Sequence, residues 1–511
     1  MIFFENKFFL LRSLITSVLL TKIQKNDIII SDFIKGIFLM DRYGKLAKNT
    51  MLISIGVLTS KLIVFLMVRF YTGYLTPAEY GDADLISQTA NLLFPVISLG
   101  ITDGVFRYAI NSSTDRNRVF SSGAFVILLG SIFLLLCLPL LNLLIGDRID
   151  VTAVVLYTIS SCIHSICSQF VRGLGNTRLF AVQGIVNTFS VVALNILFLA
   201  VLGLGIDGYV YSIVISDLLC AIYLILREKL WRYITFRLDR SLIKRMLRYS
   251  IPLIPTAIFW WITSVSDRYM INWMVDSTAN GIYTIACKLP TAIVLLSGAF
   301  SDAWQYSAVS ERKDEEASEY KTFFSDGWLS FQGILFFGCS LVIALAKPGI
   351  KLLATEDYYS AYEYVPLLCC AMVFSSFATF MGSAFLVFKR SRLSFVTSMV
   401  GALANIVLNF ILIPKYEIYG AAVATLASYF IVFVIRAFMS KKLVDFKMYI
   451  VRTVICSAII LLQTVCTYFD PKYLIAINII AVLATVAIYF KTFYSVITKV
   501  LKTFLSKRKS K

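Results

Sequence analysis

The chain has 511 residues, of which 59% are hydrophobic and only 15% are charged. Soluble globular proteins carry about 25% charged residues, so this composition excludes an ordinary water-soluble domain. The formal net charge of +18 does not by itself indicate a nucleic-acid partner, because the cytoplasmic loops of membrane proteins collect Lys and Arg. The composition therefore predicts a polytopic helical membrane protein.

Residues 1–39 contain no run that is convincing as a membrane span. The stretch from Phe8 to Leu20 is too short to cross a bilayer and lacks a small-residue cleavage site. We expect this segment to be a peripheral N-terminal extension or a mis-assigned start, with Met40 opening the functional chain.

About fourteen apolar stretches follow, each near the ~20 residues that a helix needs to cross a ~30 Å hydrocarbon core. We place them at 50–72, 81–106, 119–145, 151–171, 179–203, 208–226, 249–275, 281–306, 321–346, 361–388, 393–413, 419–438, 448–468 and 472–492. With an even number of spans, both termini lie on the same side of the membrane.

Loop charge predicts which side that is. Most Lys and Arg outside the spans fall in the loops on one face, whereas the opposite loops hold only Arg148, Lys347, Lys351, Lys415 and Lys472. The positive-inside rule then places both termini in the cytoplasm. The longest outer connection, 347–361, is too short for a catalytic domain, and no P-loop, metal site or nucleophilic triad is recognisable. We therefore expect neither an enzyme nor a metalloprotein.

The second half of the chain echoes the first. The segment MVRFYTGYLTPAEYGDADLI (67–86) resembles SDRYMINWMVDSTANGIYTI (266–285), so that Arg69 matches Arg268 and Gly81 matches Gly281 within one residue. The segments 177–208 and 391–420 form a second matching pair. Because six spans separate equivalent helices, both halves run in the same direction, an arrangement that recurs in transporters with a central site.

This repeat predicts an all-α integral membrane fold of about fourteen transmembrane helices, in two pseudo-symmetric bundles around a central cavity. The expected parts are an extension (1–39), an N-terminal helical bundle (40–226), a cytoplasmic amphipathic linker (227–248), a C-terminal helical bundle (249–440), and two additional helices with a basic cytoplasmic tail (441–511). The linker combines eight cations with interspersed aromatic residues, a pattern typical of a segment that lies on an anionic leaflet.

Charged residues within spans are costly in lipid and usually face the interior of a bundle, where they mark a pathway. We predict that Lys61, Arg69, Arg268 and Lys288 border the cavity. An excess of cations at this depth favours an anionic cargo, since Arg matches phosphate oxygens as a fork and Lys adds a point charge.

Other intramembrane residues have less specific interpretations. Asp103, Asp267 and Asp302 are candidates for binding a coupling H+ or Na+, and no other cofactor is expected. His164, the only histidine, is interpreted as a hydrogen-bonded packing residue in preference to a proton relay. The deep tryptophans Trp260, Trp261 and Trp304 are candidates for stacking on sugar rings.

Several segments resemble one known family. MDRYGKLAKNT (40–50), GVLTSKLIVFL (56–66), LTPAEYGDADLI (75–86), SDRYMINWMVDSTANGIYTIACKLP (266–290) and NIVLNFILIPKYEIYGAAVATLAS (405–428) occur in the order and spacing of bacterial polysaccharide-unit flippases. These flippases form the polysaccharide transport family, within the superfamily that also holds the MATE drug exporters. The resemblance covers Met40 to about Lys491, nearly the whole chain.

The resemblance implies a V-shaped pair of bundles in the bacterial cytoplasmic membrane. It implies a lipid-linked cargo, undecaprenyl-pyrophosphate oligosaccharide, which is moved to the periplasmic face by alternating access without bond chemistry. The family's cavity cations carry over to Lys61, Arg69, Arg268 and Lys288. Membrane lipids and a glycan polymerase with its chain-length machinery are the implied partners, and the absence of a decisive acid leaves the coupling ion open.

Three alternatives remain open at this point. A MATE-type exporter shares the expected fold but would favour an acidic cavity for cationic drugs. A lipid II or teichoic-precursor flippase handles closely related cargo. A polysaccharide polymerase or ligase would also be polytopic and basic, but it would need a large outer catalytic loop.

Overall fold

The computed structural model describes residues 63, 65–110, 114–146, 149–235, 238–298, 300–301, 304, 317–388, 390–469 and 472–509. These ranges contain helices and no β-strand, which confirms the all-α prediction. Lys61 and Asp302 lie outside the described residues, as do the predicted extension 1–39 and most of the first predicted span.

The N-terminal bundle begins with a helix over 65–74. It continues with α3 (Pro77–Ile97), α4 (Ile101–Ile110), α5 (Arg116–Ile145), α6 (Val151–Gly173), α7 (Thr177–Asn195), a π-helical turn (Ile196–Val201) and α8 (Gly205–Glu228). Its core lies where α4, α5, α6 and α8 meet, around residues such as Val105, Phe120 and Phe170.

A short linker joins this bundle to the next. It consists of a 3-10 turn (Leu230–Tyr233), α9 (Arg240–Ser250) and a second 3-10 turn (Ile251–Leu253). Helix α9 is amphipathic: Leu242 and Met246 are buried against α4 and α5, whereas Arg245 and Arg248 are exposed. The Asp239 carboxylate accepts hydrogen bonds from the backbone of Leu242 and from Ser241, and these bonds hold its pKa below the ordinary value.

The C-terminal bundle contains α10 (Ile254–Met274), α11 (Ser277–Ala286), a half-helix over Thr291–Gly298, α13 (Ala317–Ala344), α14 (Ala346–Leu353), a 3-10 segment (Glu356–Glu363), α15 (Val365–Val387) and α16 (Ser391–Val444). Two further helices follow, α17 (Ile450–Phe469) and α18 (Leu474–Lys509). Its core is larger and rich in aromatic rings, among them Trp328, Phe377 and Phe380.

Helix α16 is two helices that fold back on each other at Glu417, whose backbone is not helical. Asn405 on the first arm hydrogen-bonds to Thr425 and Ser428 on the second, and Arg436 reaches back to Thr397. The arms therefore run antiparallel, as expected from the two separate spans predicted at 393–413 and 419–438.

Nine of the described helices are long and apolar enough to cross a membrane, and the number reaches eleven if each of two bent pairs is one span. The first pair bends by 56° between Ile97 and Ile101, and the second bends by 42° between Ala286 and Thr291. The predicted total of fourteen stays a prediction, because the first predicted span lies largely outside the described residues.

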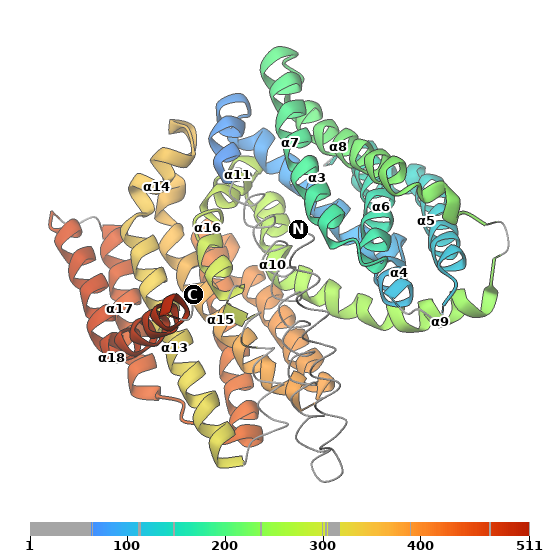
Figure 1. Cartoon of the computed structure of the whole chain (residues 1–511). Helices are drawn as coiled ribbons and strands as arrows, with labels where there is room; N and C mark the ends of the chain where they lie inside the picture. The colour runs from blue at the N-terminus through green and yellow to red at the C-terminus, as the bar shows by residue number, and fades with distance from the viewer. Residues whose placement is uncertain are drawn as a thin grey trace, which may run out of the picture.

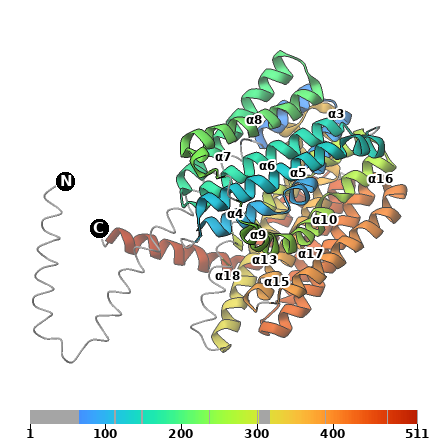
Figure 2. The ribbon, with the colours of Figure 1, turned by 90° about the vertical axis from the view of Figure 1, so that its right-hand side faces the viewer.

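Figure 1 shows α4 to α8 on the right and α13 to α18 on the left, with α3, α10 and α11 between them. Helix α9 runs along one edge and leads from the first group into α10. We call the end that carries α9 the linker end, and the opposite end, where α3 meets α11, the closed end. Figure 2 shows that the last turns of α18 extend beyond the body of both bundles.

Candidate functional site

The two bundles meet most closely at the N-termini of α3 and α11, which begin 200 positions apart, at Pro77 and Ser277. Each helix has a side-chain cap: Thr76 forms a capping box with Glu79, and Asp276 accepts from the backbone of Ala279. A Cβ on Gly81 would collide with the Ser277 carbonyl oxygen, and one on Gly281 would collide with that of Pro77. Two glycines, which the sequence repeat aligns with each other, thus allow the backbones to touch.

A buried ion pair lies next to this contact. Nη1 of Arg268, on α10, lies 2.7 Å from both carboxylate oxygens of Asp84, on α3, and the side chains are 14% and 9% exposed. The Nε of Arg268 is buried and has no hydrogen-bond partner among the described residues. The pair joins the two bundles and leaves one guanidinium donor unused.

Arg69 lies further toward the closed end. Its guanidinium donates to the Lys351 carbonyl oxygen at 3.1 Å and also to that of Ala354. The side chain is exposed and borders a surface cavity of 470 Å³, lined also by Thr355, Glu356 and Tyr359. Arg69 therefore bridges the N-terminal bundle to the segment that follows α14.

Lys288 occupies the break between α11 and the half-helix over Thr291–Gly298. Its Nζ lies 5.7 Å from the centre of the Tyr80 ring, a cation–π distance across the two bundles. Three of the four predicted cavity cations are thus described, and all three contact the opposite bundle.

The hydrogen bonds between the bundles are concentrated at one end, where buried apolar residues of the N-terminal bundle such as Val68, Tyr71 and Leu75 also join the core of the C-terminal bundle. Within the described part of the chain, every hydrogen bond that joins the two bundles has its N-terminal partner between Arg69 and Thr89. The side chains of Asp103 and Arg107, on the linker half of the first bundle, are exposed instead. Hydrogen bonds therefore join the two bundles at the closed end, and none of the described ones joins them near the linker end.

Asp267 belongs to a buried oxygen-rich network inside the C-terminal bundle. Its carboxylate accepts hydrogen bonds from the hydroxyls of Tyr283 and Thr425, the latter at 3.2 Å, and from the Arg268 backbone at 3.0 Å. Asn405 extends the network from Thr425 toward α10 and along the first arm of α16. Asp267 is 3% exposed, whereas Asp103 is exposed on α4, so these two candidate acids have different surroundings.

The three predicted sugar-stacking tryptophans also differ. Trp304 is buried among Phe323, Phe324 and Phe380, with its ring nitrogen donating to Ser383 at 3.0 Å. Such a ring has no free face for a sugar.

The other two lie on α10. Trp261 donates to the Gln88 carbonyl oxygen on α3 at 3.1 Å, and Trp260 is 37% exposed. The guanidinium of Arg436 lies 5.9 Å from the centre of the Trp260 ring. Of the three indoles, only Trp260 combines a deep position with an exposed surface.

Sequence reasoning missed two buried charges. Asp84 falls within the apolar span predicted at 81–106, and only the position of Arg268 within another span indicates that a carboxylate partner is needed. Arg436 is 2% exposed and is held by hydroxyl and carbonyl oxygens of Thr397, Ser398 and Ala378. No carboxylate faces it in the described part of the chain.

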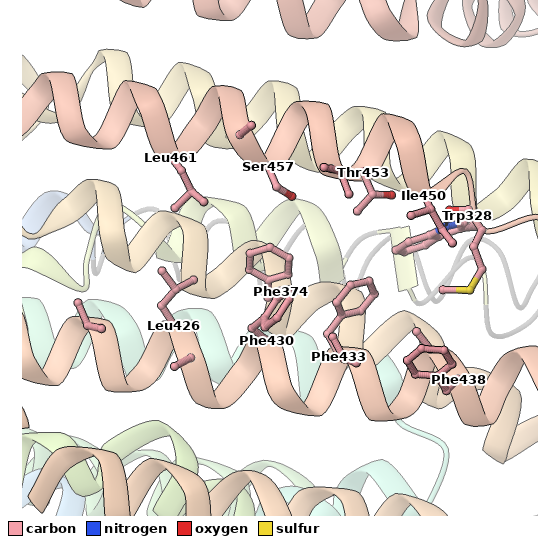
Figure 3. A pocket seen from close by; sticks show the side chains of 17 residues that line it. Trp328, Phe374, Leu426, Phe430, Phe433, Phe438, Ile450, Thr453, Ser457 and Leu461 are labelled. Atoms are coloured by element: carbon pink, nitrogen blue, oxygen red, sulfur yellow. Dashed lines mark hydrogen bonds between the residues drawn. The ribbon is translucent and has the colours of Figure 1, made fainter. Parts of the chain in front are cut away.

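An apolar groove of 670 Å³ lies between the second arm of α16 and α17. Figure 3 shows Phe374, Phe430 and Phe433 along one wall and Ile450 and Leu461 on the other side. The described residues that line it include no charged group, so the groove can hold hydrocarbon but offers nothing to a phosphate. Among the described residues no cluster of three or more His, Cys, Asp or Glu could hold a metal ion.

Fold and interface together define a multi-pass membrane protein of two helical bundles that close on each other at one end. The chain belongs to the polysaccharide biosynthesis protein family, whose sequence model matches residues 46–305, about half of its length. This membership confirms the resemblance seen in the sequence motifs.

Known relatives agree with this assignment. An uncharacterised membrane protein of Methanocaldococcus jannaschii is 25% identical over 423 residues, which cover 77% of this chain and 97% of that protein. A probable flippase of Haloferax volcanii is 23% identical over 241 residues, which cover 44% of this chain and 47% of that protein. Among solved structures, a lipid II flippase in an inward closed conformation superposes with a TM-score of 0.66 at 16% identity, covering 87% of this chain and 100% of that one. That likeness shows a shared two-bundle fold.

Proposed function

We propose that the protein is a flippase that moves undecaprenyl-pyrophosphate-linked oligosaccharide units across the bacterial cytoplasmic membrane, for surface polysaccharide biosynthesis. Both termini lie in the cytoplasm in this proposal, so that the closed end faces outward. Family membership and the named flippase among its relatives support the class. The observation that carries the mechanism is the inter-bundle pair of Arg268 and Asp84, with its unused guanidinium donor.

The closed end has the properties of a gate. Hydrogen bonds and one ion pair join the separate bundles there, beside buried apolar residues such as Leu75 and Tyr80. The polar contacts can be exchanged for contacts with water or cargo. Alternating access then consists of breaking these contacts while contacts form at the linker end. No covalent bond is made or broken, so no catalytic residue is required.

A diphosphate competes well for Arg268. It offers more acceptor oxygens than the carboxylate of Asp84, and charge-assisted pairs of arginine with phosphate are strong and directional. Cargo that reaches Arg268 would engage the free Nε and weaken the link to Asp84, so that binding itself loosens the gate. Lys288 and Arg69, with Lys61 outside the described residues, supply further positive charge in this proposal, while the polyprenyl tail stays in lipid.

The Asp267 network is our candidate for ion coupling. Two hydroxyls contact its carboxylate, which also accepts from the backbone of Arg268. Binding of H+ or Na+ at Asp267 would therefore act directly on the residue that forms the gate. Asp103 is a weaker candidate because it is exposed, and Trp260 is the indole that we propose to contact sugar. A glycan polymerase with its chain-length machinery is the proposed partner on the outer face.

The test replaces Arg69 and Arg268 with Ala, separately and together, in a strain whose own gene is deleted. We expect surface polysaccharide to fall at least tenfold, after correction for the abundance of each variant, while lipid-linked units accumulate inside. The matched control is Arg178→Ala, an exposed cation at the linker end. Normal polysaccharide in both variants would contradict the proposal, and altered drug susceptibility alone would favour the MATE-type exporter.

The same strain separates the remaining alternatives. A polymerase or ligase defect would leave single units exposed on the outer face, whereas a flippase defect retains them inside. A flippase for lipid II or a teichoic precursor would accumulate that precursor instead of the oligosaccharide unit.

A further inference from the structure

The N-terminal bundle contains a second buried polar centre that takes no part in the gate. His164 is the only histidine of the chain and lies on α6, with a side chain 15% exposed. Its Nδ1 lies 3.0 Å from a carboxylate oxygen of Asp217, on α8, whose side chain is 9% exposed. An imidazole and a carboxylate are thus in direct contact between two membrane-spanning helices.

Neutral polar groups complete the surroundings of this pair. Asp217 also accepts hydrogen bonds from the Ser161 hydroxyl at 2.7 Å and from the Asn187 amide at 3.0 Å. The other ring nitrogen of His164 lies 2.7 Å from the amide oxygen of Gln183, on α7. The Gln183 amide nitrogen is occupied, since it donates to Ser168 at 3.1 Å, which leaves its oxygen toward the ring.

The hydrogen-bond partners of the His164 ring indicate its protonation state. The nearest partner of each ring nitrogen is an oxygen, at 3.0 Å and 2.7 Å, while the Asn187 amide nitrogen lies farther from Nδ1, at 3.5 Å. A neutral imidazole carries only one N–H, whereas the imidazolium carries two. A doubly protonated ring beside an ionised Asp217 satisfies every contact and has no net charge. Loss of one proton leaves a net negative charge and one nitrogen facing an acceptor without a hydrogen, which is unfavourable away from water.

We propose that His164 and Asp217 form a proton-binding site within the N-terminal bundle. The site holds its proton while α6, α7 and α8 enclose it. When a rearrangement of these helices admits water, the ring N–H bond breaks, the proton passes to a water molecule, and the electron pair stays on the ring nitrogen. Binding of one proton is thereby linked to the closed arrangement of this bundle.

The geometry favours a proton over a metal cation. Sodium ions need several oxygen lone pairs directed at one point, and here an imidazole nitrogen faces the carboxylate at 3.0 Å instead. The Asp267 network differs in this respect, because two hydroxyl oxygens lie against its carboxylate. The His164 site therefore does not depend on which ion, or which cargo, the gate uses.

Few other ionisable groups act on the pair. Cys220 of α8 donates to the Gln183 oxygen at 3.3 Å, and Tyr157 of α6 lies within electrostatic reach of Asp217 and of Asp84, on α3. Helix α7 contributes only neutral amides to the contacts. The described charged residues of α4 and α5 are exposed, namely Asp103, Arg107, Arg116 and Arg118. Helix α3, which packs on α6 and α8, carries the partly buried Asp82 and Asp84. A pH response is therefore attributed to His164 and Asp217 by its loss in a variant of Asp217.

A single histidine makes the proposal directly measurable. The full chain is purified through a histidine-free tag, labelled with 15N-histidine and placed in lipid nanodiscs, so that only the His164 ring gives imidazole signals. We expect both ring nitrogens to be protonated at pH 7 in the wild-type protein and the ring to be neutral in Asp217→Asn. A neutral ring in the wild-type protein at pH 7 overturns the proposal, whether or not the variant folds.

Linkage to conformation is tested on the same protein. Spin-label distances between α6 and α8 are recorded from pH 6 to pH 10, and the ratio of compact to separated populations should change by up to about tenfold per pH unit. The change should vanish in Asp217→Asn and persist in Asp207→Asn, an exposed carboxylate on the same helix. A pH-independent ratio in the wild-type protein, or an equal response in both variants, contradicts the proposal. Because neither readout involves cargo, its failure would leave the proposed flippase activity untouched.

Discussion

Gly81 and Gly281 lie against each other where the two bundles touch. The position that a Cβ on Gly81 would take lies 2.9 Å from the backbone nitrogen of Gly281. Since the two residues belong to helices that begin 200 positions apart, this contact joins equivalent points of the two halves. A gate at this point needs two backbones in contact, and any side chain there would hold them apart.

We therefore expect Gly81→Val to prevent the closed end from sealing. The valine must displace the backbone around Ser277, so the bundles should separate at this end and transport should fall at least tenfold. Spin-label distances across the closed end should lengthen. Gly73→Ala is the control, because no heavy atom lies within 4 Å of its added Cβ. An unchanged distance in Gly81→Val would show that the contact is dispensable.

The pair of Arg268 and Asp84 allows a double-mutant cycle. Arg268→Ala leaves a buried carboxylate without its partner and should lower the free energy of unfolding by about 3–5 kcal/mol. The combined Arg268→Ala, Asp84→Ala variant should recover much of that stability but not transport, because the cargo cation is still missing. Thermal unfolding in detergent and surface polysaccharide give the two readouts. If the double variant transports normally, Arg268 does not bind cargo.

Asp267→Asn tests ion coupling. The amide keeps the shape of the carboxylate but cannot neutralise a cation, so any stabilisation by Na+ or dependence of transport on a proton gradient should disappear. Unfolding temperatures with and without 100-fold excess Na+ over its Kd should differ by the equivalent of about 2.7 kcal/mol in the wild-type protein if Na+ is the ion. Asp326→Asn, an exposed carboxylate of α13, is the control. Identical ion responses in wild type and Asp267→Asn would exclude this network from coupling.

Replacing Trp304 and replacing Trp260 should have different effects on the free energy of unfolding. Trp304→Ala opens a cavity in an aromatic core and should cost about 3–5 kcal/mol of unfolding free energy. Trp260→Ala removes a partly exposed ring and should change stability much less while lowering transport of the oligosaccharide unit. Thermal unfolding and oligosaccharide transport, measured for both variants, distinguish a packing role from a sugar-binding role. A stable Trp304→Ala protein with impaired transport would restore the sugar-contact role to Trp304.

Much of the fold was predictable because transfer into lipid is a property of each segment alone. A run of ~20 apolar residues forms a helix in a bilayer whatever its neighbours are, since the backbone must satisfy its own hydrogen bonds there. The repeat added the match of Gly81 with Gly281, which the structure places in contact. Residues 391–444 are a further example, because the two spans predicted at 393–413 and 419–438 correspond to the two antiparallel arms of α16.

The partners of buried charges were not predictable. Arg268 and Asp84 are separated by 184 positions, and which face each helix turns toward the other depends on the packing of the whole interface. Trp260 and Trp304 occupy similar apolar windows, yet one is 37% exposed and the other 6%.

The amino-acid sequence alone determined that this protein is an all-helical membrane protein with a duplicated architecture, because hydrophobicity and internal repeats can be read from the order of the residues. Only the tertiary structure decided that Arg268 faces Asp84, that Asp267 and His164 centre separate polar networks, and that the bundles close at one end. The physical reason is that a hydrogen bond or ion pair depends on the relative rotation of helices distant in the chain, which no local pattern encodes.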